Sequence, residues 1–103
     1  MMNGDADIQV WLEQMTQTQP SMIVPYVESD RGRTLRYLVQ TVNIGATGRA
    51  MMSQGGTIRL EAGVPTALGR MSVTRAPENN CFVELFLREA GAPERKYHFE
   101  CPG

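Results

Sequence analysis

Few residues in this 103-residue chain have side chains that could perform chemistry. His98 is the only histidine, and it falls at an outward position of a strand-like stretch, where a histidine is usually solvated. No convincing Ser-His-Asp set can be assembled around it. The two cysteines, Cys81 and Cys101, lack the Cys-x-x-Cys spacing of metal and redox sites. The sequence therefore predicts a protein that is not an enzyme and that holds no cofactor and no metal ion.

The charged residues are unevenly distributed along the chain. Seven basic residues and one acidic residue, Glu61, fall between positions 31 and 75, which gives this part a charge of +6, whereas the rest carries −7. Such a division can fold into a dipolar surface. The alternative is that the arginines are solvated and only happen to cluster in sequence. The basic part contains one aromatic residue, Tyr37, so we expect no nucleic-acid surface of interleaved basic and aromatic side chains.

Short strands must position these residues. Alternation of apolar and polar residues predicts strands over residues 7–13, 22–28, 34–44, 49–54, 57–61, 68–74, 81–88 and 95–101. The pair Gly55-Gly56 predicts a two-residue hairpin turn, and Pro25 cannot donate to a ladder, which places its strand at an edge or a bulge. No apolar stripe with a helical period is present. About seven short antiparallel strands separated by turns indicate an all-β sandwich or barrel.

The last two strands favour one register. If they fold about Gly91, Cys81 faces Cys101 and the pairs between them on that face are apolar, while the opposite face pairs Glu84 with His98. This register predicts a Cys81–Cys101 disulfide, at a non-hydrogen-bonded position of the two strands. The alternative is two buried free thiols in a cytosolic protein. A disulfide would imply an oxidising compartment, such as the periplasm or the cell exterior.

The length of the chain allows one domain. We expect a disordered N-terminus over residues 1–6 and a single domain over residues 7–103, present as a monomer. No apolar run approaches the length of a membrane helix, so membrane insertion is not expected. Residues 1–7 show no signal-peptide pattern, and we expect a mature form from which a signal has been removed.

An ordered set of motifs resembles the CsgC/CsgH family of curli-associated proteins, most closely its CsgH branch. The resemblance covers residues 34–100, about two thirds of the chain, and no single motif is diagnostic of it. In order, the motifs are the loop Gly45–Gly48, the pair Ser53-Gln54, the stretch Thr57–Leu60, the Pro-containing connection Ala62–Leu68, the strand Met71–Val73 and the turn Pro77–Asn80.

The resemblance implies an immunoglobulin-like sandwich of about seven strands, located in the periplasm. It also implies a chaperone-like activity, in which the protein binds amyloidogenic curli subunits and inhibits their nucleation until they are exported. One branch of the family carries a Cys-x-Cys on the third strand, but the matching segment here, Arg33–Leu35, has no cysteine. A redox role based on that motif is therefore not expected for this chain.

The candidate surface for a curli subunit comprises Arg36, Arg49, Gln54, Arg59 and Arg70. Weak contacts guided by charge suit a partner without fixed structure. An alternative is addition of a partner strand to the edge that contains Pro25. Two other functions also remain open: a structural or adhesion-type immunoglobulin-like module that assembles with its own copies, and a thiol-disulfide partner domain.

Overall fold

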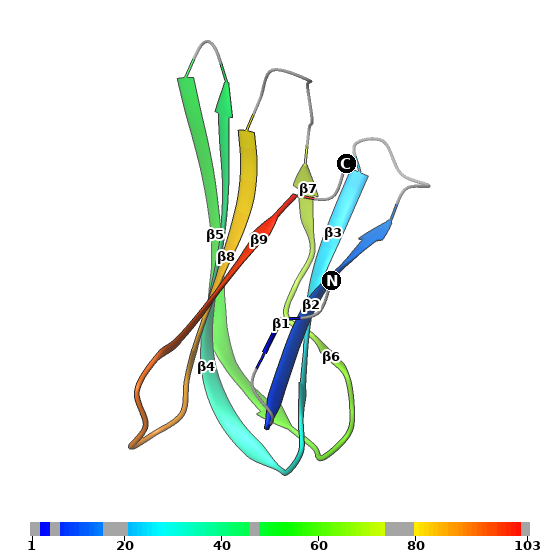
Figure 1. Ribbon diagram of the computed structural model, residues 1–103, viewed down its shortest axis with the longest axis vertical. Helices are drawn as coiled ribbons and strands as arrows, with labels where there is room; N and C mark the ends of the chain where they lie inside the picture. Colours follow the sequence, from blue (N-terminus) through cyan, green and yellow to red (C-terminus); the bar gives the residue numbers. More distant parts are fainter. Residues whose placement is uncertain (1–2, 5–6, 16–20, 46–47, 74–79, 102–103) are drawn as a thin grey trace.

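The computed structural model describes residues 3–4, 7–15, 21–45, 48–73 and 80–101 (Figure 1). Within these residues it contains nine strands, of which two, β1 and β6, have only two residues each. The remaining seven agree with the predicted total of about seven, because two of the eight predicted ranges, 49–54 and 57–61, lie in one strand. The strands are β1 (Asn3–Gly4), β2 (Ile8–Met15), β3 (Ser21–Ser29), β4 (Arg33–Gly45), β5 (Gly48–Leu60), β6 (Thr66–Ala67), β7 (Met71–Val73), β8 (Asn80–Arg88) and β9 (Arg95–Glu100).

The strands form two antiparallel sheets that pack face to face as a sandwich (Figure 1). One sheet has the order β1-β2-β3, with β6 and β7 both pairing with the far side of β3, and the other has the order β5-β4-β8-β9. The alternation predicted for residues 34–44 is confirmed at its start, since Leu35 and Val39 are buried whereas Arg36 and Leu38 are exposed. Buried apolar side chains of both sheets fill the core, among them Val10, Val27, Val39, Val83 and Leu85.

Pro25 does not mark an edge strand, contrary to the expectation from sequence. Its strand, β3, is an inner strand, with β2 on one side and β6 and β7 on the other. The Pro25 carbonyl accepts a hydrogen bond of 2.8 Å from the Leu68 N–H, so the nitrogen of Pro25 faces the same side. The neighbouring strand is interrupted there, between Ala67 and Met71. Because Pro25 lacks an N–H only where the neighbouring strand is interrupted, the sheet loses no hydrogen bond. Of the strand predicted over residues 68–74, residues 71–73 form β7.

Gly55-Gly56 does not form a hairpin turn, which corrects a second expectation. The two strands predicted around it are one strand, β5, paired with β4 from Gly45↔Gly48 through Arg33↔Leu60. The glycines suit the middle of a strand because Tyr37 lies over Gly56: a Cβ on Gly56 would lie 3.4 Å from the Tyr37 hydroxyl oxygen.

The register of the last hairpin is confirmed, with Val83 opposite Phe99 and Glu84 opposite His98. The predicted disulfide joins Cys81 to Cys101, whose Cα atoms are 5.4 Å apart. One detail differs, because the Cys101 N–H donates a hydrogen bond of 3.1 Å to the Cys81 carbonyl. The cysteines therefore occupy a hydrogen-bonded position of the ladder rather than a non-hydrogen-bonded one.

Two residues of the N-terminal stretch lie in a strand. Asn3 and Gly4 belong to β1, whose backbone pairs with Val10 and Gln9 of β2. Both residues fall within the stretch 1–6, which the sequence predicts to be disordered. The other residues of that stretch lie outside the described part of the chain.

Candidate functional site

Three arginines share the outer face of the β5-β4-β8-β9 sheet. Arg36 on β4 lies directly opposite Arg88 on β8. Arg59 on β5 is the diagonal neighbour of Arg36, because Arg59 pairs with Thr34 while Arg36 pairs with Thr57. All three arginines are exposed. We refer to Arg36, Arg59 and Arg88 as the arginine face.

The arginine face has no internal neutralisation. Among the described residues, no carboxylate lies within ion-pair distance of Arg36, Arg59 or Arg88. Like charges at directly opposed positions of two strands destabilise a sheet. The Arg36–Arg88 pair therefore does not serve stability, and its positive charge is available to an acidic partner.

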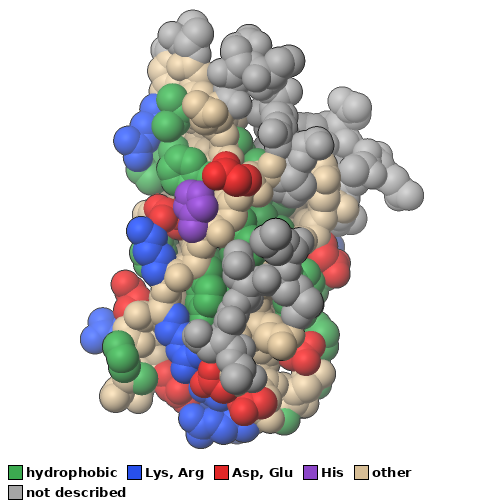
Figure 2. Space-filling view, in the orientation of Figure 1, with side chains coloured by type: hydrophobic (Ala, Val, Ile, Leu, Met, Phe, Trp, Pro, Cys, Tyr) green, Lys and Arg blue, Asp and Glu red, His purple; other side chains and the backbone are tan. Residues whose placement is uncertain are grey.

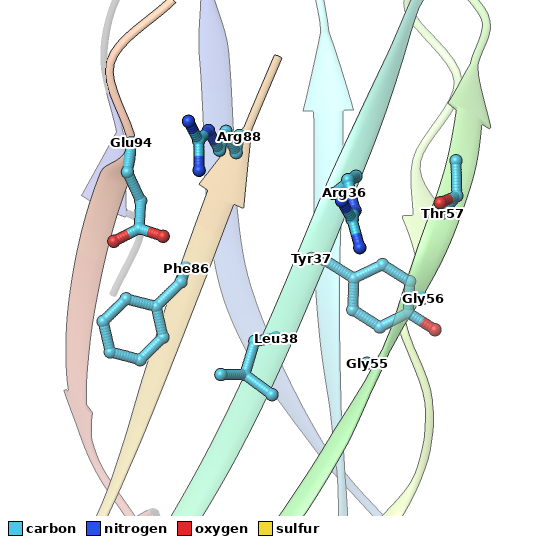
Figure 3. Close-up of a pocket in the computed structure, with 9 residues that line it drawn as sticks. All are labelled: Arg36, Tyr37, Leu38, Gly55, Gly56, Thr57, Phe86, Arg88 and Glu94. Atoms are coloured by element: carbon cyan, nitrogen blue, oxygen red, sulfur yellow. The ribbon is translucent and has the colours of Figure 1, made fainter. Parts of the chain in front are cut away.

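A hollow of about 580 Å³ opens beside these arginines (Figure 3). It exists because Gly55, directly opposite Leu38, has no side chain to cover that residue, which is left 37% exposed. The strands also approach closely here: a Cβ on Gly55 would lie 3.0 Å from the Tyr37 carbonyl oxygen. The hollow is lined by Arg36, Tyr37, Leu38, Gly55, Gly56, Thr57, Phe86, Arg88 and Glu94.

The lining combines apolar and positively charged side chains with one carboxylate, that of Glu94. Phe86 lies opposite Leu38 on the neighbouring strand, so the floor of the hollow is apolar, while Arg36 and Arg88 supply positive charge above it (Figure 3). Apolar contact combined with arginine is typical of protein-binding surfaces. The site therefore suits an extended protein segment that presents an apolar side chain close to a carboxylate.

The β8–β9 part of the same sheet face is internally paired. The Lys96 ammonium forms an ion pair with the Glu84 carboxylate at 3.0 Å, and His98 Nδ1 lies 3.8 Å from the same carboxylate. The Lys96 ammonium lies 5.8 Å from the centroid of Phe86, and the His98 ring stacks on Phe82 with a centroid distance of 5.2 Å. Because the charges of Glu84 and Lys96 are paired with each other, this part of the face carries less unpaired charge than the arginine face.

The structure brings only part of the predicted site together. Arg36 and Arg59 share the arginine face, but Arg49 lies near the opposite end of β5. Gln54 lies on the other face of β5, opposite the inward residue Val39, and its side-chain amide donates a hydrogen bond of 3.0 Å to the Arg70 carbonyl. Arg70 lies in the segment between β6 and β7, in the other sheet. Gln54 and Arg70 therefore link the two sheets at this point.

Sequence reasoning missed three residues of the site: Leu38, Phe86 and Arg88. The final hairpin register already places Phe86 and Arg88 outward. The sequence did not predict that β4 pairs with β8, because these strands are distant along the chain. No local signal sets this pairing, although the alternation of both strands is consistent with it.

A second group of charges lies at the end of the sandwich where the β3–β4 and β8–β9 connections meet. The Arg33 side chain is 1% exposed and forms ion pairs with Asp30 at 2.8 Å, Glu89 at 3.2 Å and Asp7 at 3.5 Å. Its Nε donates a hydrogen bond of 2.6 Å to the Ser29 hydroxyl. We refer to Asp7, Asp30, Arg33, Glu89 and Arg95 as the Arg33 cluster. Figure 2 shows acidic and basic side chains together at the lower end of the molecule.

Within the Arg33 cluster, Asp7 and Arg95 form a bidentate pair. The two Arg95 guanidinium nitrogens Nη1 and Nη2 each donate a hydrogen bond of 2.9 Å to one carboxylate oxygen of Asp7. Hydrogen bonding to Arg95 holds the pKa of Asp7 well below its ordinary value of 3.8, and the same contact raises the pKa of Arg95. These contacts tie the residue before β2 to the first residue of β9, so the cluster is structural.

In the described part of the chain, no three His, Cys, Asp or Glu side chains are grouped as they would be around a metal ion. None of its elements is a helix long and apolar enough to span a membrane. The candidate site is the arginine face with its hollow, where exposed arginines lie beside apolar side chains.

The fold and site define an immunoglobulin-like sandwich with exposed arginines on the outer face of one sheet. The family model for thin aggregative fimbriae synthesis proteins of the CsgC type matches residues 4–91, and the chain belongs to this curli-associated family. No curated protein shows significant sequence similarity to the chain.

Two solved structures share the fold. The E. coli curli protein CsgC superposes with a TM-score of 0.75 at 18% sequence identity, over 87% of this chain and 95% of the other. The solution structure of R. palustris CsgH gives a TM-score of 0.71 at 14% identity, over 90% of this chain and 91% of the other. Both confirm the sandwich predicted from the resemblance.

Proposed function

We propose that the protein is a periplasmic chaperone-like protein that binds curli subunits and delays their amyloid nucleation, without catalysis. The observation that supports the proposal best is the arginine face: two exposed arginines directly opposed on neighbouring strands, with no carboxylate partner in the described part of the chain. Membership of the curli-associated family points to curli subunits as the partner.

Delaying nucleation in this way requires only weak, rapid contact between the protein and a segment of the subunit. Amyloid nuclei grow as extended segments pair at unpaired strand edges. A basic face raises the encounter rate with an acidic segment, and an open hollow holds that segment without requiring a fixed shape. Even brief occupancy removes the segment from nucleation. The protein can therefore act below equimolar amounts, because nuclei are rare.

The disulfide supports the proposed compartment. Cys81 and Cys101 are bonded and buried, at 8% and 5% exposure. Disulfides of this kind persist in oxidising compartments, which include the periplasm. Burial also argues against a thiol-disulfide partner domain, because an exchanging thiolate must reach the sulfur atoms. We expect the bond to resist common cellular reductants in the folded protein, as monitored by thiol labelling and mass spectrometry.

The first experiment follows thioflavin-T fluorescence of a purified curli subunit, with this protein added well below equimolar amounts. We expect the wild type to lengthen the lag phase. The variant Arg36→Glu/Arg59→Glu/Arg88→Glu is expected to lose most of that effect, with an affinity for the monomeric subunit lower by about tenfold or more, because three attractive contacts become repulsive.

Arg70→Glu and Arg36→Glu are matched single variants, since each reverses one exposed arginine but only Arg36 lies on the arginine face. Arg70→Glu is expected to keep the wild-type lag. A triple variant that is folded and oxidised yet delays fibres as well as the wild type would refute the electrostatic mechanism. An unchanged lag with the wild type would refute the proposed function.

A further inference from the structure

The free edge of β5 carries a second binding feature next to the arginine face. β5 is the terminal strand of its sheet, and among the described strands only β4 pairs with it. No backbone hydrogen bond from another described segment reaches it. Thirteen residues of backbone, Gly48–Leu60, thus present one unpaired side.

The strand registers of the sheet determine which residues face that free edge. Hydrogen bonding alternates from residue to residue along antiparallel strands. The bond from Cys101 to Cys81 fixes the odd residues of β8 toward β9. Following the pairings through β4, the even residues of β5 bond to β4 and the odd ones face outward. The N–H and C=O groups of Met51, Ser53, Gly55 and Thr57 therefore point away from the sheet.

This edge lacks the usual protection against strand addition. Natural edges are blunted by charges, prolines or bulges. β5 has no charged residue and no proline from Ala50 to Ile58, and its register with β4 is uninterrupted. Charges occur only near its two ends, at Arg49 and Arg59.

Gly55 makes the middle of the edge receptive to a large side chain. In a strand added to β5, the residue opposite Gly55 points to the outer face, where Leu38 is left uncovered. A bulky side chain lying across an edge glycine stabilises such a pairing. On the inner side, Tyr37 already covers Gly56 in this manner, so only the Gly55 position is vacant.

The charges indicate which partner fits. A second copy of this chain pairing antiparallel along the whole of β5 would place Arg49 opposite Arg59 at both ends, and like charges directly opposed are unfavourable. A segment with an uncharged middle and carboxylates at its ends is complementary instead. Arg36 and Arg88 lie on the same face as Gly55 and extend this attraction.

We propose that an extended segment of the curli subunit adds to the free edge of β5 as an antiparallel or parallel strand, with a bulky apolar residue over Gly55 and acidic residues near Arg49 and Arg59. This inference rests on the proposed function and names the structural mode of its binding. Main-chain hydrogen bonds supply the affinity in this mode, and the vacant position at Gly55 supplies the selectivity.

The test compares Ser53→Pro with Ser53→Ala, using monomeric curli subunit as the probe. Proline removes the N–H that points to the free edge but no hydrogen bond to β4, so the sheet is retained. We expect Ser53→Pro to raise the dissociation constant by about tenfold, whereas Ser53→Ala leaves it unchanged. Equal affinity of the two folded variants would overturn the strand-addition inference and leave the proposed function standing.

A second measurement uses the wild type alone, in case Ser53→Pro does not fold. Amide hydrogen exchange is followed by NMR with and without the subunit. We expect Met51, Ser53, Gly55 and Thr57 to exchange at least several-fold more slowly with the subunit present, because their N–H groups gain partners. Unchanged exchange at these four amides while the subunit is bound contradicts strand addition. No binding by the wild type refutes both this inference and the proposed function.

Discussion

The Arg33 cluster and the arginine face use the same side chain, only three residues apart on β4, in opposite ways. Arg33 points inward, is 1% exposed, and contacts Asp30, Glu89 and the Ser29 hydroxyl. Arg36 points outward, is exposed, and lies opposite another arginine. Residues on the two sides of a strand alternate, so this separation follows from the odd spacing of the two positions.

The two regions differ in what their charge does: in the Arg33 cluster it stabilises the fold, and on the arginine face it remains available to a binding partner. A buried guanidinium is tolerated only where its donors are satisfied, and the Arg33 cluster draws its carboxylates from the start of β2 and from two connections. The arginine face has no such partners among the described residues. Net charge alone could not reveal this, because it counts Arg33 and Arg36 equally.

The largest effect on stability is expected from Arg33→Met. This change removes the guanidinium and leaves Asp7, Asp30 and Glu89 near one another without it. We expect a loss of about 3 kcal/mol in the free energy of unfolding, measured by urea denaturation. Fibre delay per folded molecule should stay at the wild-type level. An unchanged unfolding midpoint would show that the cluster is not structural and would remove the contrast between the two regions.

A smaller effect, present at neutral pH and lost in acid, is expected from Asp7→Asn. The pKa of Asp7 is lower in the folded protein than its ordinary value of 3.8, so the unfolded chain binds the proton first as pH falls. The stability from this group is therefore present above about pH 4 and is lost as pH falls further. Asp7→Asn should be less stable at pH 7 and lose less on going from pH 7 to pH 3.

The control for the acid experiment is Glu61→Gln, since Glu61 is exposed and in no ion pair among the described residues. Its denaturation midpoint should fall between pH 7 and pH 3 as steeply as that of the wild type. If Asp7→Asn shows the same fall as Glu61→Gln, the Asp7–Arg95 pair does not carry the acid dependence.

Local features of the sequence predicted much of the fold. The last hairpin was predictable because a single register satisfied burial, opposite charges and sulfur pairing together, as Val83↔Phe99 and Glu84↔His98 show. Gly55-Gly56 was misread because glycine serves both in turns and where strands approach closely. Only the pairing with Leu38 and Tyr37 distinguishes the two uses.

The site was less predictable because it depends on contacts between distant segments. Arg36 and Arg59 were identified from their outward positions, but the partner of Arg36, Arg88, enters through the pairing of β4 with β8. The position of Gln54, away from the arginine face, was unpredictable for a related reason. Its bond to the Arg70 carbonyl crosses between the sheets, and strand alternation does not predict such a contact.

The smallest effect on stability, and the sharpest test of the contrast, is expected from Arg88→Leu. Removing one of two opposed positive charges should leave the free energy of unfolding within about 0.5 kcal/mol of the wild type, and on the more stable side. Fibre delay should nevertheless weaken, since half of the opposed pair is gone.

Added salt should weaken subunit binding by the wild type more than binding by Arg88→Leu, because screening acts on the charge that the variant lacks. Arg88→Lys, which keeps the charge, should restore both the delay and the salt dependence. If Arg88→Leu instead destabilises the fold as much as Arg33→Met, the arginine face is structural too, and the division between the two regions is wrong.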